Sequence, residues 1–307
     1  MPERDQFPPN SLLSELKIPD HLPEALRRVH SKGREAVVLA FSGGGALATV
    51  LIGVVGAFLE AGIPIDAVVG TSAGAIGAAI AAYVHSLPAW LEAKAQGESI
   101  NWPQIAEFAY FAGGIFSFVK LARYINTQVS GIRRKNPKSY QPTPHVITTT
   151  DANLNTLLKN DPRLFYDLPQ EFLGTVVQAS CSVRFVIAPA RVGSYLLWDG
   201  GVGPAREPVA VARAIAGEAL VVSVLLTGNP ARESPPEFRI EPGTRGKTFL
   251  GQAVFHPDNV FEGYLLGTQA VDQILALMAA REIRPSFRSG FYAPGQLLPY
   301  FSQRQIF

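Results

Sequence analysis

The sequence predicts an α/β fold with a mainly parallel central sheet, on two observations. Short apolar runs rich in β-branched residues occupy 36–41, 65–69 and 219–226, as is typical of strands buried on both faces. Helical stretches at 47–61 and 73–84 directly follow the first two runs. A strand–helix–strand–helix succession of this kind indicates βαβ units, whose strands lie parallel.

The rest of the chain continues this alternation less regularly. Further strands are expected at 146–150, at 195–198 and, with a weaker signal, at 176–180. Residues 227–247 are rich in Pro, Gly and charge, so we expect an extended surface loop there. The remaining expected helices occupy 22–31, 207–216 and 258–281.

Composition and charge exclude several classes of protein. The net charge of +2 is too small, and Lys and Arg are too dispersed, for a nucleic-acid partner. The single cysteine, Cys181, excludes an intrachain disulfide and a cysteine-based metal site. The apolar stretch 46–59 is too short to span a bilayer, and 67–91 is too rich in Gly, Ala and Ser. No signal peptide is evident, so we expect a soluble, cytoplasmic protein.

A candidate nucleophile lies between the second strand and its helix. Gly70-Thr71-Ser72-Ala73-Gly74 is the only G-x-S-x-G sequence in the chain. A serine on a strand-to-helix turn has a strained backbone, and glycines two residues away on either side remove the clashes that larger residues would cause. The N-terminal amides of the next helix then stabilise negative charge beside the hydroxyl. The pattern favours nucleophilic catalysis by Ser72 over an idle serine in a glycine-rich turn.

A glycine cluster, Gly43, Gly44 and Gly45, ends the first strand and admits two interpretations. Phosphate binding of the dinucleotide type requires G-x-G-x-x-G, and this spacing fails at Ala48. An oxyanion hole requires backbone N–H groups that converge without side chains in the way, which consecutive glycines allow. Because parallel neighbouring strands end at the same edge of a sheet, the cluster is expected beside Ser72. It therefore supports acyl transfer more than nucleotide binding.

Two residues are candidates for the base that a serine nucleophile needs. Among the five histidines, only His256 falls in the chain order of a Ser-Asp-His hydrolase. Asp199 stands at the end of the strand-like run 195–198 and is followed by Gly200 and Gly201. A tight turn would hold this carboxylate with room for a partner, although Asp-Gly is also common in ordinary turns.

Three ordered blocks of sequence resemble the patatin-like phospholipase family. They span roughly residues 36–226. The blocks are Ser42-Gly43-Gly44-Gly45-Ala46 with Ile52-Gly53-Val54 and Leu59-Glu60-Ala61-Gly62-Ile63, then Gly70-Thr71-Ser72-Ala73-Gly74, and finally Ala179-Ser180 with Trp198-Asp199-Gly200-Gly201-Val202.

The resemblance implies a three-layer α/β/α fold and a lipid acyl hydrolase that needs no cofactor or metal. By position, it implies that Ser72 is the nucleophile and that Asp199 is the base of a dyad without histidine. It also implies that Gly43, Gly44 and Gly45 form the oxyanion hole, and we expect the Ala73 amide at the start of the next helix to contribute to it. The expected substrates are the carboxylic esters of phospholipids or related acyl lipids.

The sequence departs from the family pattern at three places. Leu47 and Ala48 stand where the family has a basic residue and glycine, and Arg184-Phe185 stands where it has Pro-Gly. Glu207-Pro208 replaces the family's Asn-Pro. Two alternatives therefore stay open beside the dyad enzyme. One is a lipid-binding protein with impaired turnover, and the other is an esterase that uses His256.

The expected domain is 35–285, preceded by an N-terminal extension, 1–34, and followed by a C-terminal tail, 286–307. Within it, the aromatic-rich region 86–144 is expected to form a helical lid or an acyl channel. Ordinary packing over the sheet is the competing interpretation. Transient contact with a membrane surface is a further expectation for the region. The candidate substrate-binding residues are Phe108, Phe111, Ile115, Phe116 and Val119.

Overall fold

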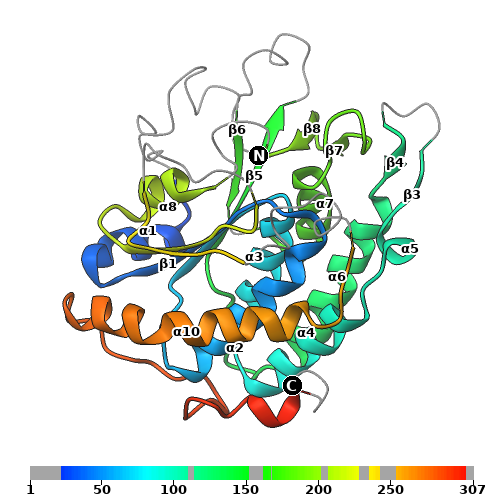
Figure 1. Ribbon diagram of the computed structural model, residues 1–307. Coiled ribbons are helices and arrows are strands. Elements are labelled where there is room, and N and C mark those ends of the chain that lie inside the picture. Colours follow the sequence, from blue (N-terminus) through cyan, green and yellow to red (C-terminus); the bar gives the residue numbers. More distant parts are fainter. Residues whose placement is uncertain are drawn as a thin grey trace.

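A mixed sheet of eight strands forms the centre of the molecule (Figure 1). The computed structural model describes residues 22–109, 114–151, 162–166, 168–201, 207–227, 235–242 and 254–301. The strands run in the order β10-β9-β1-β2-β5-β8-β7, and β6 pairs with the other edge of β5. They are β1 Val37–Phe41, β2 Ala67–Thr71, β5 His145–Asp151, β6 Pro162–Tyr166, β7 Ala190–Val192, β8 Tyr195–Asp199, β9 Leu220–Val224 and β10 Phe238–Ile240.

The strands from β10 to β5 are parallel, whereas β6, β7 and β8 pair antiparallel with their neighbours. Both faces of the parallel part are buried. In β1, Val37, Leu39 and Phe41 belong to one hydrophobic core. Val38 and Ala40 belong to a second core on the opposite face. The two-residue period of a strand thus explains why β1 is continuously apolar.

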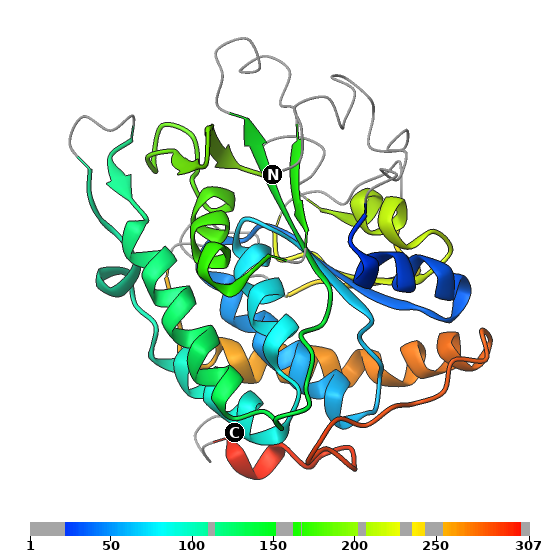
Figure 2. The same ribbon diagram turned by 180° about the vertical axis from the view of Figure 1, so that it is seen from behind.

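Helices cover both faces of the sheet, which gives three layers (Figures 1 and 2). The smaller core is closed by α1 Glu24–Lys32 and α8 Val209–Ala216. The expected α/β fold with a mainly parallel sheet is confirmed. The larger core lies under the other long helices. These helices are α2 Val50–Glu60, α3 Ala73–Tyr83, α4 Leu87–Ser99, α6 Val119–Arg134, α7 Gln170–Ser180 and α10 Asn259–Ala279.

Smaller elements complete the described chain. The two-stranded sheet of β3 Glu107–Phe108 and β4 Phe116–Ser117 stands apart from the main sheet. No helix in the part of the chain that the structure describes is long and apolar enough to cross a bilayer. The remaining short helices are α5 Trp102–Ile105 and the 3-10 helices η2 Gly33–Glu35, η3 Gly45–Thr49 and η7 Leu298–Tyr300.

Two expected elements are wrong. Residues 176–180, expected as a weak strand, form the last turns of α7, where they are buried beside α6. Residues 238–240, expected within a surface loop, form β10, which extends the sheet by pairing with β9. Tertiary packing overrides the local strand preference of β-branched residues in the first case. In the second, a short edge strand carries little sequence signal.

Candidate active site

The pairing of β5 brings Ser72 and Asp199 together. β6 occupies one edge of β5, so β2 and β8 share the other edge. Thr71, the last residue of β2, lies opposite Thr148, and Asp199, the last residue of β8, lies opposite Thr149. Because β2 is parallel and β8 antiparallel to β5, the two strands end face to face. The residue after β2 therefore meets the residue that ends β8.

Ser72 occupies the tight turn between β2 and α3. Its φ of 54° lies in the left-handed region, which is rare for a residue with a side chain. A Cβ at Gly70 would collide with the backbone of Gly74, and a Cβ at Gly74 would collide with the carbonyl of Phe41. Both glycines of the G-x-S-x-G sequence are thus required by close approach of the backbone. Strain of this kind is typical of functional residues.

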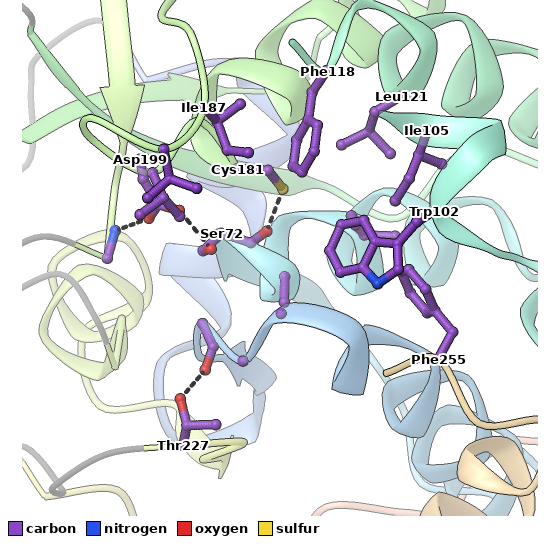
Figure 3. Close-up of a pocket in the computed structure, with 18 residues that line it drawn as sticks. Ser72, Trp102, Ile105, Phe118, Leu121, Cys181, Ile187, Asp199, Thr227 and Phe255 are labelled. Atoms are coloured by element: carbon purple, nitrogen blue, oxygen red, sulfur yellow. Dashed lines mark hydrogen bonds between the residues drawn. The ribbon is translucent and has the colours of Figure 1, made fainter. Parts of the chain in front are cut away.

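The Ser72 hydroxyl donates a hydrogen bond to the Asp199 carboxylate. The distance from Oγ to Oδ2 is 2.7 Å (Figure 3). The backbone N–H of Gly201 donates to the other oxygen, Oδ1, at 2.6 Å. A Cβ at Gly201 would lie only 2.9 Å from Oδ1, so the glycine leaves room for the carboxylate. Asp199 is only 3% exposed, which keeps its charge largely away from bulk water.

The end of α7 holds the backbone of Ser72 on both sides. The Ser72 N–H donates to Ser180 Oγ at 2.8 Å, and Ser180 Oγ donates to the carbonyl of Thr148 on β5. The Cys181 thiol donates to the Ser72 carbonyl at 3.2 Å. Burial, together with the charge of Asp199, raises the pKa of Cys181 well above its usual value, so the thiol stays protonated as a donor. Ala179-Ser180 was part of the family resemblance, but sequence alone gave this serine no role.

The glycine cluster lies beside Ser72, and hydrogen bonds from the segment after β9 hold the peptide that precedes Gly44. Thr227 Oγ1 donates to the Gly43 carbonyl at 2.9 Å, and Leu226 N–H donates to Ser42 Oγ at 2.7 Å. In a trans peptide the C=O and the following N–H point in opposite directions. The N–H of Gly44 therefore points away from Thr227, which lies across the loop from Ser72 in Figure 3.

Steric contacts explain the first two glycines, and backbone geometry explains the third. A Cβ at Gly43 would lie 3.2 Å from Ser72 Cβ, and one at Gly44 would collide with Leu226. Gly45 has a φ of 57°, which glycine adopts without strain. No hydrogen bond within the described chain uses the N–H of Gly43, Gly44 or Gly45. All three glycines line the cavity beside Ser72.

A cavity of about 460 Å³ opens above the Ser72–Asp199 pair. The pair and the glycine cluster form its polar end (Figure 3). The rest of its wall is mostly apolar and comes from α3, the region 102–121, the α7–β7 connection and the segment before α10. The apolar lining residues are Ala73, Ile76, Trp102, Ile105, Phe118, Leu121, Val183, Val186, Ile187 and Phe255.

The four candidate substrate-binding residues that the structure describes lie outside the wall of this cavity. Phe108, Ile115 and Val119 are 67%, 58% and 48% exposed. Phe116 is partly buried, with its ring centre 5.1 Å from that of Phe108. Phe111 lies outside the described residues. The region 86–144 does reach the cavity, but through Trp102, Ile105, Phe118 and Leu121.

His256 lies at the surface beside Asp258. Its Nδ1 is 3.3 Å from Asp258 Oδ2, and both side chains are about half exposed. His145 Nε2 accepts the N–H of Leu168, and His85 contacts the carbonyl of Ala82. None of these imidazoles hydrogen-bonds to Ser72. Among the described residues, no group of three or more His, Cys, Asp or Glu side chains could hold a metal ion.

The departures from the family pattern occupy different environments. Leu47 and Ala48 lie in η3 and are buried in the large core rather than in the cavity wall. Glu207 is buried and accepts hydrogen bonds from Ser223 and from the Arg239 guanidinium, which tie the start of α8 to β9 and β10. Phe185 is 76% exposed. The departures at Leu47, Ala48 and Glu207 thus lie in the packed framework and not in the cavity wall around the dyad.

Comparison with known proteins gives the family. The family model described as patatin-like phospholipase matches residues 39–212, which include Ser72, Asp199 and the glycine cluster. The chain belongs to the patatin-like phospholipase family. The match runs from β1 into α8, so the family's region contains every strand that positions the dyad.

Curated relatives come from mycobacteria. Uncharacterized NTE family proteins of Mycobacterium tuberculosis and Mycobacterium bovis are 28% identical over 225 residues. The alignment covers 71% of this chain and 57% of each relative, so the chain spans little more than half of their length.

Two solved structures of other proteins were also matched at low similarity. VipD from Legionella pneumophila is 14% identical with a TM-score of 0.41, over 81% of this chain and 67% of that one. The type III effector protein ExoU is 14% identical with a TM-score of 0.35, over 83% of this chain and 55% of that one.

Proposed function

We propose that the protein is a lipid acyl hydrolase that cleaves carboxylic esters through a Ser72–Asp199 dyad. The observation that carries the proposal is the 2.7 Å hydrogen bond from Ser72 Oγ to Asp199 Oδ2 at the polar end of an apolar cavity. A strained serine, a buried carboxylate and free backbone donors meet the requirements of acyl transfer. Membership of the patatin-like phospholipase family supports acyl lipids as the substrate class.

Asp199 acts first as the base. It takes the proton of Ser72 as Oγ forms a bond to the ester carbonyl carbon, and the carbonyl electrons move to oxygen. Collapse of this tetrahedral intermediate breaks the bond to the alcohol, which leaves with the proton from Asp199 and gives an acyl-serine. Water then loses a proton to Asp199 and attacks the acyl carbon. The fatty acid leaves, and Ser72 recovers its proton.

The glycine cluster supplies the oxyanion hole in this proposal. The Gly44 N–H points away from Thr227, and Gly43, Gly45 and Ala73 line the same cavity as Ser72. A developing oxyanion is stabilised by donors that are already fixed, and loss of one donor slows acyl transfer by about 10²–10³-fold. The side chains of Leu47 and Ala48 do not alter these donors, because the donors are backbone N–H groups.

The apolar part of the cavity takes the acyl chain. Trp102, Phe118 and Leu121 lie near one another in its wall (Figure 3), and the ring centres of Trp102 and Phe118 are 6.1 Å apart. Each buried methylene of a substrate contributes about 0.8 kcal/mol of hydrophobic stabilisation. We therefore expect longer acyl chains to bind more tightly until they fill the space, and a charged acyl group to be rejected.

The dyad is tested with Ser72→Ala and Asp199→Asn. We expect each to lower kcat for a short nitrophenyl ester by at least about 10³-fold, as removal of a catalytic nucleophile or base does in serine hydrolases. A fluorophosphonate probe should label Ser72 in the unaltered chain, located by peptide mapping. His256→Ala is the matched control and should keep full activity, since that imidazole is on the surface.

Other results would contradict the dyad. Loss of activity in His256→Ala, with Asp199→Asn tolerated, would indicate a Ser-His-Asp esterase. No probe labelling and no hydrolysis of any acyl ester by a folded, unaltered chain would indicate a lipid-binding protein without turnover.

A further inference from the structure

Two chain segments expose large apolar side chains on the same side of the molecule. One is the β3–β4 hairpin and the other is the connection between α7 and β7. We call their exposed residues the apolar lip: Phe108 (67% exposed), Ile115 (58%), Val183 (43%), Phe185 (76%) and Val186 (44%).

Backbone hydrogen bonds join the two segments into one surface. Both Ile115 N–H and Phe116 N–H donate to the carbonyl of Val186, at 3.0 and 2.9 Å. Ala188 N–H donates to the carbonyl of Phe116 at 2.7 Å. The hairpin and the connection lie side by side in both views of the molecule (Figures 1 and 2). The exposed side chains are therefore held in place by a hydrogen-bonded framework rather than by the free ends of loops.

The lip borders the mouth of the cavity. Val183 and Val186 contribute to both the lip and the cavity wall, which also contains Ser72. Phe185, between them, has a φ of 64°, a strained conformation for a residue with a large side chain. Strain of this kind persists where the surrounding structure imposes it, and it is common at binding sites. Here the structure holds an aromatic ring in water, next to the entrance of an apolar cavity.

The charge around the lip favours an anionic partner. Within the described residues 107–109, 114–123 and 183–192, the cationic side chains are Lys120, Arg123, Arg184 and Arg191, and the only acidic one is Glu107. Glu107 and Lys120 lie 4.0 Å apart and offset each other, and Nε and Nη2 of Arg184 are buried, so Arg123 and Arg191 are the exposed cations that remain in these ranges. Exposed apolar side chains accompanied by an excess of exposed cations are the pattern by which a protein surface inserts into the headgroup layer of an anionic bilayer.

We propose that the apolar lip docks onto the surface of an anionic lipid bilayer. The aromatic and aliphatic side chains enter the boundary between headgroups and acyl chains, and the surrounding cations contact the headgroups. The cavity mouth then faces the bilayer, so an acyl chain passes from lipid to cavity without crossing water. This inference rests on the proposed function for its role, but docking itself does not require turnover.

The test measures vesicle binding and catalysis separately. The double variant Phe108→Ser with Phe185→Ser is compared with Tyr292→Ser, whose side chain is 73% exposed in the C-terminal segment. Co-sedimentation uses vesicles of phosphatidylcholine alone and of an equal mixture with phosphatidylglycerol. We expect the unaltered chain and Tyr292→Ser to bind the mixed vesicles more tightly and to be released by salt. The double variant should bind at least about tenfold more weakly.

Catalytic readouts separate docking from chemistry. Hydrolysis of a short soluble ester by the double variant should stay within about twofold of the unaltered chain, because neither side chain touches the dyad. Hydrolysis of phospholipid in vesicles should fall with binding. Vesicle binding that depends on the lip without hydrolysis of either substrate would refute the proposed function and leave the docking surface intact.

Three outcomes would overturn the docking proposal. The first is that the unaltered chain binds neither kind of vesicle. The second is that the double variant binds as tightly as Tyr292→Ser. The third is that both variants lose binding equally while circular dichroism shows both to be folded. Hydrolysis of short esters in the first case would leave an esterase whose exposed apolar surface serves another partner.

Discussion

At the scale of single residues, the dyad depends on atoms that belong to neither of its members. The Ser180 hydroxyl links the Ser72 N–H to the Thr148 carbonyl, so one side chain joins β2, β5 and α7 at the nucleophile. Gly201 supplies the donor that holds the second carboxylate oxygen of Asp199. These partners position the reacting groups, and their removal should affect rate more than substrate affinity.

Ser180→Ala tests this positioning role. It leaves the N–H of Ser72 without its acceptor and frees the strained turn to move, so we expect kcat for a short ester to fall by about 10–10²-fold with little change in KM. Ser182→Ala is the matched control. That serine is equally buried, but its hydroxyl donates only to the Gln178 carbonyl within α7. Similar kcat values for the two variants, or an effect on KM alone, would show that Ser180 has no specific role.

The motif residues were predictable from sequence because their chemistry is local. Glycines around Ser72 and after Asp199 indicate close approaches that only glycine allows, and the sequence pattern alone is enough to show them. The contact of Ser180 with Ser72 is not local, because it joins residues 108 positions apart. A serine near the end of a helix has many possible partners, so sequence alone gave no reason to choose this one.

At the scale of elements, α2 and α10 pack closely through glycines. A Cβ at Gly53 of α2 would collide with the backbone of Val260 on α10, and one at Gly263 of α10 would collide with the Val50 carbonyl on α2. The absence of side chains at these two positions lets the helix backbones touch. It also explains why a glycine remains inside α10, where it lowers helix stability by about 1 kcal/mol relative to alanine.

We expect Gly263→Ala to destabilise the protein by about 2–3 kcal/mol. The added methyl forces the helices apart in a packed core. Gly131→Ala in α6 is the control, because its Cβ would meet no backbone, only the side-chain ends of Glu92 and Gln96, at 3.3 and 3.4 Å. That change should leave stability unchanged or raise it by up to about 1 kcal/mol. Urea unfolding measures both, and equal midpoints would contradict the close-packing explanation.

The helix that borders the cavity shows where pattern recognition failed. The density of aromatic residues in this stretch indicates a binding region but does not show which side chains face the cavity, because it ignores the helical period. In α6 the buried positions Leu121, Ile125, Val129 and Ile132 recur every three or four residues. Extending that period back by three residues reaches Phe118, which lines the cavity, whereas Val119 falls on the exposed face. Periodicity could therefore have identified Phe118 and Leu121.

At the scale of the whole molecule, the meeting of Ser72 and Asp199 depends on strand pairing. The βαβ pattern predicts parallel strands, and parallel strands alone do not bring the end of β8 to the end of β2. That juxtaposition needs β8 to run antiparallel along the same edge of β5, with Asp199 opposite Thr149. Pairing register between distant strands is set by the complete core, so the sequence predicted both motifs while their 2.7 Å contact had to come from the structure.

The C-terminal segment 286–301 is held against the rest of the fold by hydrogen bonds. Glu60, buried at the end of α2, accepts hydrogen bonds from the Tyr264 hydroxyl and from the N–H groups of Gly295 and Leu297. Arg288 is partly buried and donates to the carbonyls of Val84 and Ile65. Burial lowers the pKa of Arg288 to about 10, so it stays charged at neutral pH. Residues 286–301 are thus anchored by Glu60 at the end of α2 and by Arg288, which bonds to the carbonyl that follows α3.

The burial of His85, together with the nearby charge of Arg288, makes stability depend on pH. Burial, and then the charge of Arg288, lower the pKa of His85 to about 4. An unfolded chain protonates its histidine near pH 6.5, so between about pH 6.5 and 4 the unfolded state binds the extra proton. Stability from this residue is therefore complete above about pH 6.5 and is lost as the pH falls.

His85→Gln should remove this part of the pH dependence. The amide can still donate to the Ala82 carbonyl, which His85 Nε2 contacts at 3.0 Å, and it does not titrate. Urea unfolding at pH 7 and pH 5 gives the free energy of unfolding for both chains. Between these pH values we expect the unaltered chain to lose about 2 kcal/mol more than the variant, the free energy of protonating one unfolded histidine at pH 5. Equal losses in the two chains would show that His85 takes up its proton in the folded state, and that Arg288 and burial do not keep it neutral.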